Sequence, residues 1–454
     1  MRGLSLGSAL VCLIGLLGRT DVRGASAAPV EKPPVTFSRD VAPILYANCT
    51  VCHRPGAIGP FALVTYQDAR RHAKQIADVT AQRQMPPWKP QRGFGEFKDQ
   101  RVLADAQIAT LGAWAAGGAV QGDPGQTPAV PKFKDGWQLG KPDIILKVDK
   151  PFVVPAEGAD VYVQFVFPLK VDGAEIYVRA VECRPSNLRI AHHAICFLDT
   201  SGKARQLAAK DGGSYYRRTG DVGFLPAGMT AGYVPGQTPR LAEEGSAIII
   251  KKGTDFVLQM HYHPTGKEEA DQTEIGFYLT KTRPTKRGTG ILMGSQDIDI
   301  QANDGQFQVR DEFRLPAPFK LEGIWAHMHL LGKDVRVWAT GPDGTETKLL
   351  WIDDWDFNWQ DSYQYRTPVL LPKGAVIHAQ WTFDNTASNI RNPNHPPKRV
   401  RVGENSTDEM AGVILGGEAA SDGDNLAMFI ANAGHFFEVT SRGKKFKQLH
   451  DAMQ

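Results

Sequence analysis

Histidines gather in three short clusters whose spacing suits a metal site. Six of the chain's 12 histidines lie in them. The clusters are His192 with His193, His261 with His263, and His327 with His329. In the last two clusters the histidines are two residues apart, and in a strand such residues project from the same face. Neighbours on a regular strand point to opposite faces, so the adjacent pair can share one ion only where the chain bulges or turns. Imidazoles without carboxylates suit copper and fit calcium or magnesium poorly, and zinc is the chemical alternative.

A second motif, Cys49-Thr50-Val51-Cys52-His53, carries different chemistry. The spacing C-x-x-C-H is the attachment signature of c-type haem, in which two thiols bond the haem and the adjacent histidine ligates the iron. A zinc site or a redox dithiol can also use C-x-x-C, but neither needs the histidine. We therefore expect covalent haem c on Cys49 and Cys52, with His53 as one axial ligand.

The opposite axial ligand is expected further along the chain. Met85 precedes two prolines, which end the preceding helix and hold the methionine in an extended loop. Met85 is therefore the predicted second ligand of the haem iron. His72 is the alternative, because it lies on the less polar stripe of the helix predicted from Thr65, its N-cap, to Gln84.

Residues 1–28 have the order of a secretory signal peptide. Arg2 precedes an apolar run, and small residues up to Ala28 form a cleavage site. The run is shorter than a membrane span and no later segment is apolar enough for one, so we expect a secreted or periplasmic protein without stable membrane insertion. Export permits disulfides, and Cys183 and Cys196 either form one or remain buried thiols.

Length and charge narrow the class of protein. A chain of 454 residues with 42% hydrophobic and 22% charged residues is globular and too long for one ordinary core, so several domains are expected. The formal net charge is only +3, and the expected leader carries Arg2, Arg19 and Arg23. Nothing in this balance favours a nucleic-acid partner.

The pattern of elements changes near Trp137. Before it, helices predicted at 40–47, 65–84 and 104–116 combine with the haem motif and resemble a small class I cytochrome c. After it, short runs rich in Val, Ile, Phe and Tyr alternate with turn residues, up to a last predicted strand at 436–439. The predicted fold class is therefore multidomain, with a small all-α cytochrome c domain followed by two all-β antiparallel, jelly-roll-like sandwich domains.

The boundaries of these parts follow from composition. We predict a signal peptide at 1–28, a cytochrome c-like haem domain at 36–122, a linker at 123–139, a first copper sandwich domain at 140–304, a second at 305–440 and a tail at 441–454. The β part shows no convincing long amphipathic helix. Its aromatic segment from Trp351 to Tyr365 is predicted to be an alternating strand with turns rather than a ligand surface.

The three histidine clusters, in this order, resemble those of a known enzyme family. The segments RIAHHAICFLD, FVLQMHYHPTG and GIWAHMHLLGKDVRV are similar to motifs of the copper type II, ascorbate-dependent monooxygenases, the peptidylglycine α-hydroxylating and dopamine β-monooxygenase type. The similarity spans about residues 140–439. It implies two copper ions on two β-sandwich domains. One copper, on three histidines, transfers electrons, and the other, on two histidines and a methionine, binds oxygen.

The resemblance implies which residues of this chain bind the two copper ions. The electron-transfer copper should bind His192, His193 and His261. The oxygen-binding copper should bind His327, His329 and Met410, with Met428 as the runner-up for the thioether. Three roles stay open for His263: it substitutes for His261, orients it, or faces solvent.

The resemblance and the haem motif together predict an exported haem and copper monooxygenase. It should hydroxylate a C–H bond of a small organic or peptide-like substrate with O2. The family draws electrons from ascorbate, whereas here a c-type haem on the same chain is the expected donor, with ascorbate or an external donor as the other sources. The alternative is a periplasmic electron-transfer or copper-binding protein without turnover.

Overall fold

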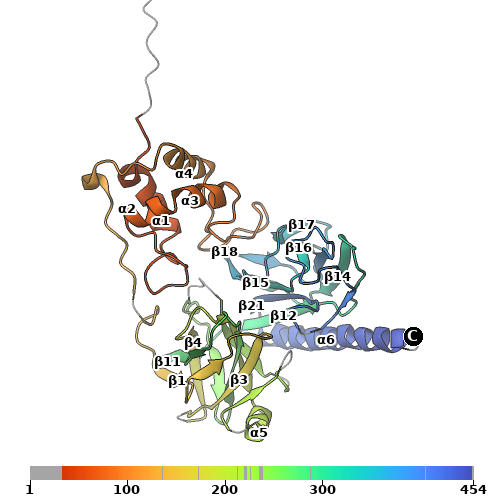
Figure 1. The fold of residues 1–454 in the computed structure, drawn as a ribbon. Coiled ribbons are helices and arrows are strands. Elements are labelled where there is room, and N and C mark those ends of the chain that lie inside the picture. Colours follow the sequence, from red (N-terminus) through yellow and green to blue (C-terminus); the bar gives the residue numbers. More distant parts are fainter. Residues whose placement is uncertain are drawn as a thin grey trace, which may run out of the picture.

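The computed structural model describes residues 33–451, apart from 135, 172, 212, 219–221, 225, 235–238, 287 and 404. The predicted leader therefore lies outside the described residues. The chain passes from N-terminal helices through two groups of strands and ends in a long helix that projects from the body (Figure 1).

The N-terminal helices are short. They are the π-helix Phe37–Val41 and the helices α1 (Ala42–Asn48), α2 (Tyr66–Arg71), α3 (Ala73–Ala81) and α4 (Asp105–Ala116), followed by a 3-10 turn at Pro124–Gln126. Thr65 caps α2 in a capping box with Asp68, which confirms the predicted N-cap. The single helix predicted from Thr65 to Gln84 is instead broken at His72, where φ is −109° and ψ is 12°. Phe37, Leu111 and Trp114 are buried among these helices.

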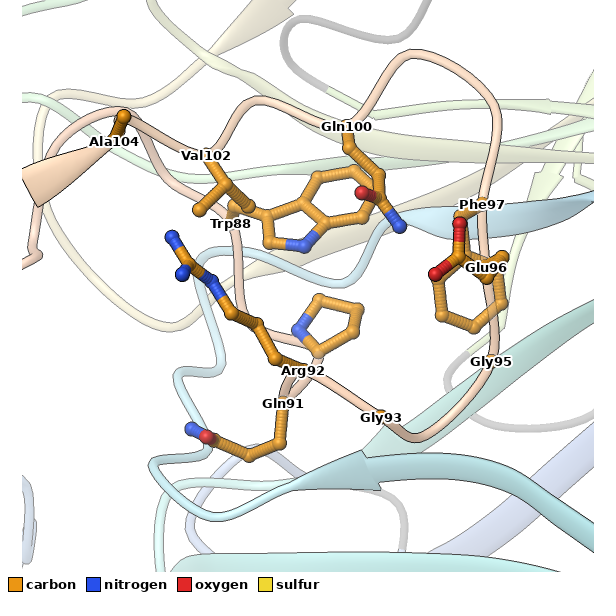
Figure 2. A pocket seen from close by; sticks show the side chains of 11 residues that line it. Trp88, Gln91, Arg92, Gly93, Gly95, Glu96, Phe97, Gln100, Val102 and Ala104 are labelled. Atoms are coloured by element: carbon orange, nitrogen blue, oxygen red, sulfur yellow. The ribbon is translucent and has the colours of Figure 1, made fainter.

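Residues 86–101, which we call the strap, leave the helices and join the C-terminal group of strands. Phe97 is 1% exposed and belongs to the core of that group. The amide of Gln91 donates to the carbonyl of Trp351 at 2.7 Å, and the amide of Lys98 donates to that of Gln364 at 2.7 Å. The strap also surrounds a small cavity of about 340 Å³ beside Trp88 (Figure 2). The strap is thus a structural part of the C-terminal half.

The first half of the β structure, residues 144–280, has two main antiparallel sheets around one core. The five-stranded sheet has the order β6-β3-β9-β5-β7 and the four-stranded sheet the order β1-β11-β4-β8, with β2 and β10 as a separate pair. The strands are β1 (Ile144–Lys147), β2 (Phe152–Val154), β3 (Val161–Pro168), β4 (Glu175–Arg184), β5 (Ala191–Asp199), β6 (Tyr215–Arg217), β7 (Gly228–Tyr233), β8 (Ile248–Lys251), β9 (Asp255–Tyr262), β10 (Glu269–Asp271) and β11 (Glu274–Thr280). Helix α5 (Lys203–Lys210) covers the far end of the first sheet (Figure 1).

The second half, residues 288–419, also has two main antiparallel sheets, each of four strands. Their orders are β12-β21-β15-β18 and β14-β19-β16-β17, and β13 pairs with β20. The strands are β12 (Gly288–Gly294), β13 (Asp299–Ile300), β14 (Phe307–Arg314), β15 (Phe319–Met328), β16 (Gly332–Thr340), β17 (Glu346–Ile352), β18 (Ser362–Leu371), β19 (Val376–Phe383), β20 (Val400–Arg401) and β21 (Ala411–Ala419). The chain ends in α6 (Asp422–Asp451). Among the described helices, none is both long and apolar enough to cross a bilayer.

The predicted fold class is wrong. The described chain is mostly β, with six sheets, and it has no separate all-α cytochrome c domain. The N-terminal helices share a small core, but the strap leaves them before α4 and gives Phe97 to the core of the second half, so they are not a separate domain. The strand predicted at 436–439 is also wrong, since these residues lie in α6. A short apolar run fits either a strand or a helix, and here the helix is 30 residues long.

The burial of Phe97 in the core of the second half leads to a prediction for stability. Replacing Phe97 with Ala should lower the free energy of unfolding of the C-terminal half by about 3–5 kcal/mol, because a buried aromatic ring is lost from its core. Leu370, which is 76% exposed, provides the control, and Leu370→Ala should cost little. Urea unfolding followed by tryptophan fluorescence measures both. Equal, small effects would show that the strap is not part of the core.

Candidate metal centres

The first site consists of His192, His193 and His261, and a β-bulge builds it. In the ladder between β5 and β9, Ala191 pairs with Tyr262 and His193 pairs with His261, so His192 is an extra residue. Such a bulge turns adjacent side chains away from strict alternation. The irregularity that the adjacent histidine pair required is therefore confirmed.

The three rings of the first site converge through the same nitrogen. Nδ1 of His193 lies 3.1 Å from Nδ1 of His192 and 3.3 Å from Nδ1 of His261. All three residues offer a ligand atom within 4.8 Å of the others. Burial lowers the pKa of His192 to about 3 and the pKa of His193 well below its ordinary value. Neutral imidazoles carry a free lone pair, so this cluster is suited to a metal ion.

Asp160 contacts the first site from its outer side, and no local pattern in the sequence indicates this residue. Its carboxylate lies 2.9 Å from Nε2 of His261 and 2.7 Å from Nδ1 of His263. Burial acts to raise the pKa of Asp160, but its contacts with the two histidines outweigh burial and lower that pKa to about 2. His263 is itself 66% exposed. Of its three possible roles, this geometry favours orienting His261 through Asp160.

The second site lies at the end of β15, where that strand meets β21. The register pairs His327 with Gly412 and Met328 with Ala411, and the ladder ends there. Continued by one residue, the same register would set Met410 opposite His329, on the face that His327 and His329 share. Met328 points the other way and is fully buried in the core.

In the second site hydrogen-bond partners hold Nδ1 of each ring, whereas in the first site the Nδ1 atoms face one another. Nδ1 of His327 lies 2.5 Å from the side-chain oxygen of Gln360, and Nδ1 of His329 lies 3.2 Å from the carbonyl oxygen of Asp408. Each ring is thereby oriented with Nε2 left for a ligand. Burial lowers the pKa of His327 to about 4 and the pKa of His329 to about 3, so both rings are neutral.

Glu409 links the two strands that supply the second site. One carboxylate oxygen accepts from the amide of His329 at 2.9 Å and from the amide of Met410 at 3.2 Å, and the other accepts from the amide of Leu331 at 2.5 Å. Complete burial raises the pKa of Glu409 to about 8. The runner-up Met428 is buried in the core of the second half, so the geometry favours Met410.

Phe357 lies between the two sites. Its ring centroid is 5.2 Å from that of His192, in a stacked arrangement, and 5.8 Å from that of His329. The two sites, built on different halves of the molecule, therefore face one another across a single ring. Phe357 belongs to the segment 353–361, which we call the bridging loop. The strand with turns predicted from Trp351 to Tyr365 consists of the end of β17, this loop and the start of β18.

The strap fixes the bridging loop. Lys89 pairs with Asp354 at 2.9 Å, Arg101 pairs with Asp361 at 2.7 Å, and the side chain of Gln91 donates to Asp353 at 2.5 Å. The same loop carries Gln360, the partner of His327. Contacts from the N-terminal part thus reach both metal sites through this loop.

In the predicted haem motif, a backbone contact orients the ring of His53. Nδ1 of His53 lies 3.1 Å from the carbonyl oxygen of Phe61, which leaves Nε2 for a metal. Burial lowers the pKa of His53 and raises the pKa of Cys49 to about 12. Cys49 and Cys52 are both free thiols and half-buried. The donor set is therefore complete for thioether attachment and one axial ligand.

The two candidates for the opposite axial ligand lie in different places. Met85 is half-buried, and its amide donates to the carbonyl of Val79 at the end of α3. The ring of His72 stacks on Phe61 at 3.7 Å, and Phe61 also contacts the ring of His53 at 4.9 Å. The predicted ligand remains Met85, while the ring contacts connect His72 to the haem histidine.

A large cavity joins the haem motif to the metal sites. Its volume is about 1390 Å³, and it extends between the N-terminal helices and the two β halves. Cys52 lines it, as do His193 of the first site and Gln360, which holds the second site. Trp325, which stacks on His327 at 5.4 Å, lines it as well. One cavity thus spans the gap between Cys52 and the two histidine sites.

Cys183 and Cys196 lie next to each other between the sheets of the first half. Both are buried thiols, and contact with Cys196 together with burial raises the pKa of Cys183. Cys183 is on β4 and Cys196 on β5, so a disulfide here would join the two main sheets. That disulfide remains a prediction.

Comparisons with known proteins assign no family to the chain. No protein-family model and no curated protein matches it. Among solved structures, the major capsid protein P2 of bacteriophage PM2 matches 62% of this chain and 98% of its own, with 9% identity and a TM-score of 0.27. PNGF-II matches 64% of this chain and 65% of its own, with 11% identity and a TM-score of 0.22. Likenesses this distant carry no argument about function.

The two sites should bind metal independently. We expect the chain to take up two copper ions, His193→Ala to remove one, His327→Ala to remove the other, and the double variant to remove both. The reason is that the two sites share no ligand. Elemental analysis after dialysis against a weak chelator measures the ratio. A single variant that loses both ions would mean one shared centre.

Asp160 should tune the first site without being a ligand. Asp160→Ala should weaken metal binding there by about 10–100-fold, because it frees the ring of His261 from its outer contact. His263→Ala should cost less, since His263 reaches His261 only through Asp160. Competition titration with a copper chelator gives both affinities. A larger loss in His263→Ala than in Asp160→Ala would make His263 a ligand.

Proposed function

We propose that this protein is an exported haem and copper monooxygenase, which hydroxylates a C–H bond of a small organic or peptide-like substrate with O2. The observation that carries the proposal is the pairing of two metal sites with different donors across Phe357. The cavity shared by Cys52 and His193 supports the haem as the source of electrons.

The donor atoms fit copper at both sites. The first site offers three imidazoles through Nδ1, and the second offers two neutral imidazoles through Nε2, with Met410 next in the register of the same strand pair. Nitrogen and thioether donors suit copper, and a thioether favours Cu(I), the state that meets dioxygen. When bound, copper supplies single-electron storage at the first site and oxygen activation at the second.

The protein's own part is to orient these ligands and to keep them neutral. Asp160 orients His261, Gln360 orients His327, and the Asp408 carbonyl orients His329. Burial keeps the rings of His192, His327 and His329 unprotonated at neutral pH, because their pKa values lie far below 7. Glu409 bonds the amides of His329 and Met410 through one oxygen, which fixes the imidazole and thioether relative to each other.

The residues of the C-x-x-C-H motif suit a covalently bound haem. Cys49 and Cys52 would hold the haem through thioether bonds, and His53 would ligate the iron through Nε2. Met85 remains the proposed opposite ligand. A haem here would supply one electron at a time, which matches a centre that must store electrons singly. Ascorbate and an external donor remain the other sources.

A second candidate function is electron transfer without turnover. Phe357 is buried and fills the space between the two sites. A protein that only carries electrons needs no room for substrate at that place, so this observation favours the carrier. A monooxygenase must instead admit its substrate from the large cavity at the side of Trp325 and Gln360.

Anaerobic stopped-flow spectroscopy tests the proposal. Copper-loaded protein with reduced haem and Cu(II) should show the haem oxidised as copper is reduced, and His193→Ala should abolish this step. Addition of O2, candidate substrates and an excess of reductant, which supplies the second electron of each turnover, should then give hydroxylated product. A haem that never reoxidises contradicts the internal donor, and oxidation of the haem without product for any substrate supports the carrier.

Substitution of Met410 distinguishes a monooxygenase from an electron carrier. Met410→Ala should remove product formation by at least about 100-fold while leaving haem oxidation by the first site intact, because only the second site loses a ligand. Met428→Ala is the matched control, since Met428 is a buried core methionine. It should lower stability by about 2–5 kcal/mol with product formation per folded protein unchanged. The reverse pattern would make Met428 the ligand.

A further inference from the structure

Helix α6 carries an apolar stripe that nothing in the described chain covers. It projects beyond the body in Figure 1. Its exposed large side chains are Leu426 (59%), Phe429 (68%), Ile430 (61%), Phe436 (40%) and Phe437 (63%). These positions follow helical spacing, so they share one face, which we call the outer stripe.

The opposite face of α6 fixes the helix to the body. Met428 is buried in the core of the second half, and Ala431 packs against the same core. The side chain of Asn432 exchanges hydrogen bonds with β12, donating to Gly290 and accepting from the amide of Leu292. His435 pairs with Asp311 at 2.8 Å. The helix is therefore anchored, and the outer stripe is held outward.

We propose that the outer stripe pairs with the outer stripe of a second copy of this chain. The stripe has the heptad spacing of paired helices, with Leu426 and Ala433 seven residues apart and the aromatic residues between and after them. A two-fold pairing uses the same surface on both copies, so it closes without leaving an exposed apolar face.

The area of the stripe is sufficient for a dimer. Taking about 200 Å² for a fully exposed side chain of this size, the five residues present roughly 500–600 Å² per copy. Two copies would together bury about 1,000–1,200 Å², which reaches the lower range of specific protein interfaces. An apolar patch of this size lies at the upper end of those on monomeric proteins, and such patches are often functional.

The charge pattern favours a protein partner over a membrane surface. Helices that lie on membranes carry lysine and arginine along their polar face. Between Asp422 and Ser441 the helix has neither, and its basic residues, Arg442, Lys444, Lys445 and Lys447, all follow the stripe in the sequence. The segment that carries the stripe itself therefore offers no positive side chain to anionic lipid.

Light scattering coupled to gel filtration, on the full mature chain over a range of concentrations, tests the pairing. Wild type should show the mass of a dimer. The variant Phe429→Glu with Phe437→Glu should be monomeric, with a dissociation constant raised at least about 100-fold. The matched control is Leu370→Glu with Ile390→Glu, which changes two exposed apolar residues outside α6 and should remain a dimer.

A cysteine cross-link locates the contact independently of folding effects. Ala433 lies on the stripe between Ile430 and Phe437, so Ala433→Cys should form a disulfide between copies under mild oxidation. Glu438→Cys, exposed on the flank, should not. A monomeric wild type, or a dimer that survives the Phe429→Glu, Phe437→Glu change, overturns the proposal. So does a wild type that stays monomeric and binds anionic vesicles, which would assign the stripe to a membrane.

Discussion

The ring of Phe357 packs on His192 from one half of the molecule and on His329 from the other. The proposed function depends on that contact, because it brings two candidate metal sites built on separate sheets to face one another. Each site alone is an ordinary cluster of imidazoles. In the proposed function, a metal ion at one site would supply electrons to the other over a short distance.

The N-terminal part takes a direct role in this arrangement. Its strap gives Phe97 to the core of the second half and holds the bridging loop through Lys89, Gln91 and Arg101. The loop in turn carries Phe357 and Gln360. The part of the chain that bears Cys49 and Cys52 is therefore mechanically connected to both metal sites, and the large cavity gives it a spatial connection as well.

The sequence predicted what depends on local spacing and missed what depends on distant contacts. The two-residue spacing of His327 and His329 and the need for a bulge at His192 follow from strand geometry alone, and both are found. Asp160 and Gln360 touch the sites from remote segments, so no local pattern could single them out. The fold class failed for the same reason. Nothing near Phe97 in the sequence shows that it completes a core more than 200 residues away, and the apolar residues of α6 were taken for a strand.

The most direct test of the account is the magnetic interaction between the two metal sites. Electron paramagnetic resonance of the protein loaded with two Cu(II) ions should show dipolar broadening and a half-field signal, since rings of both sites contact Phe357. His193→Ala should leave one isolated copper signal. Two sharp, non-interacting Cu(II) signals in the fully loaded protein would contradict the claim that the sites face each other.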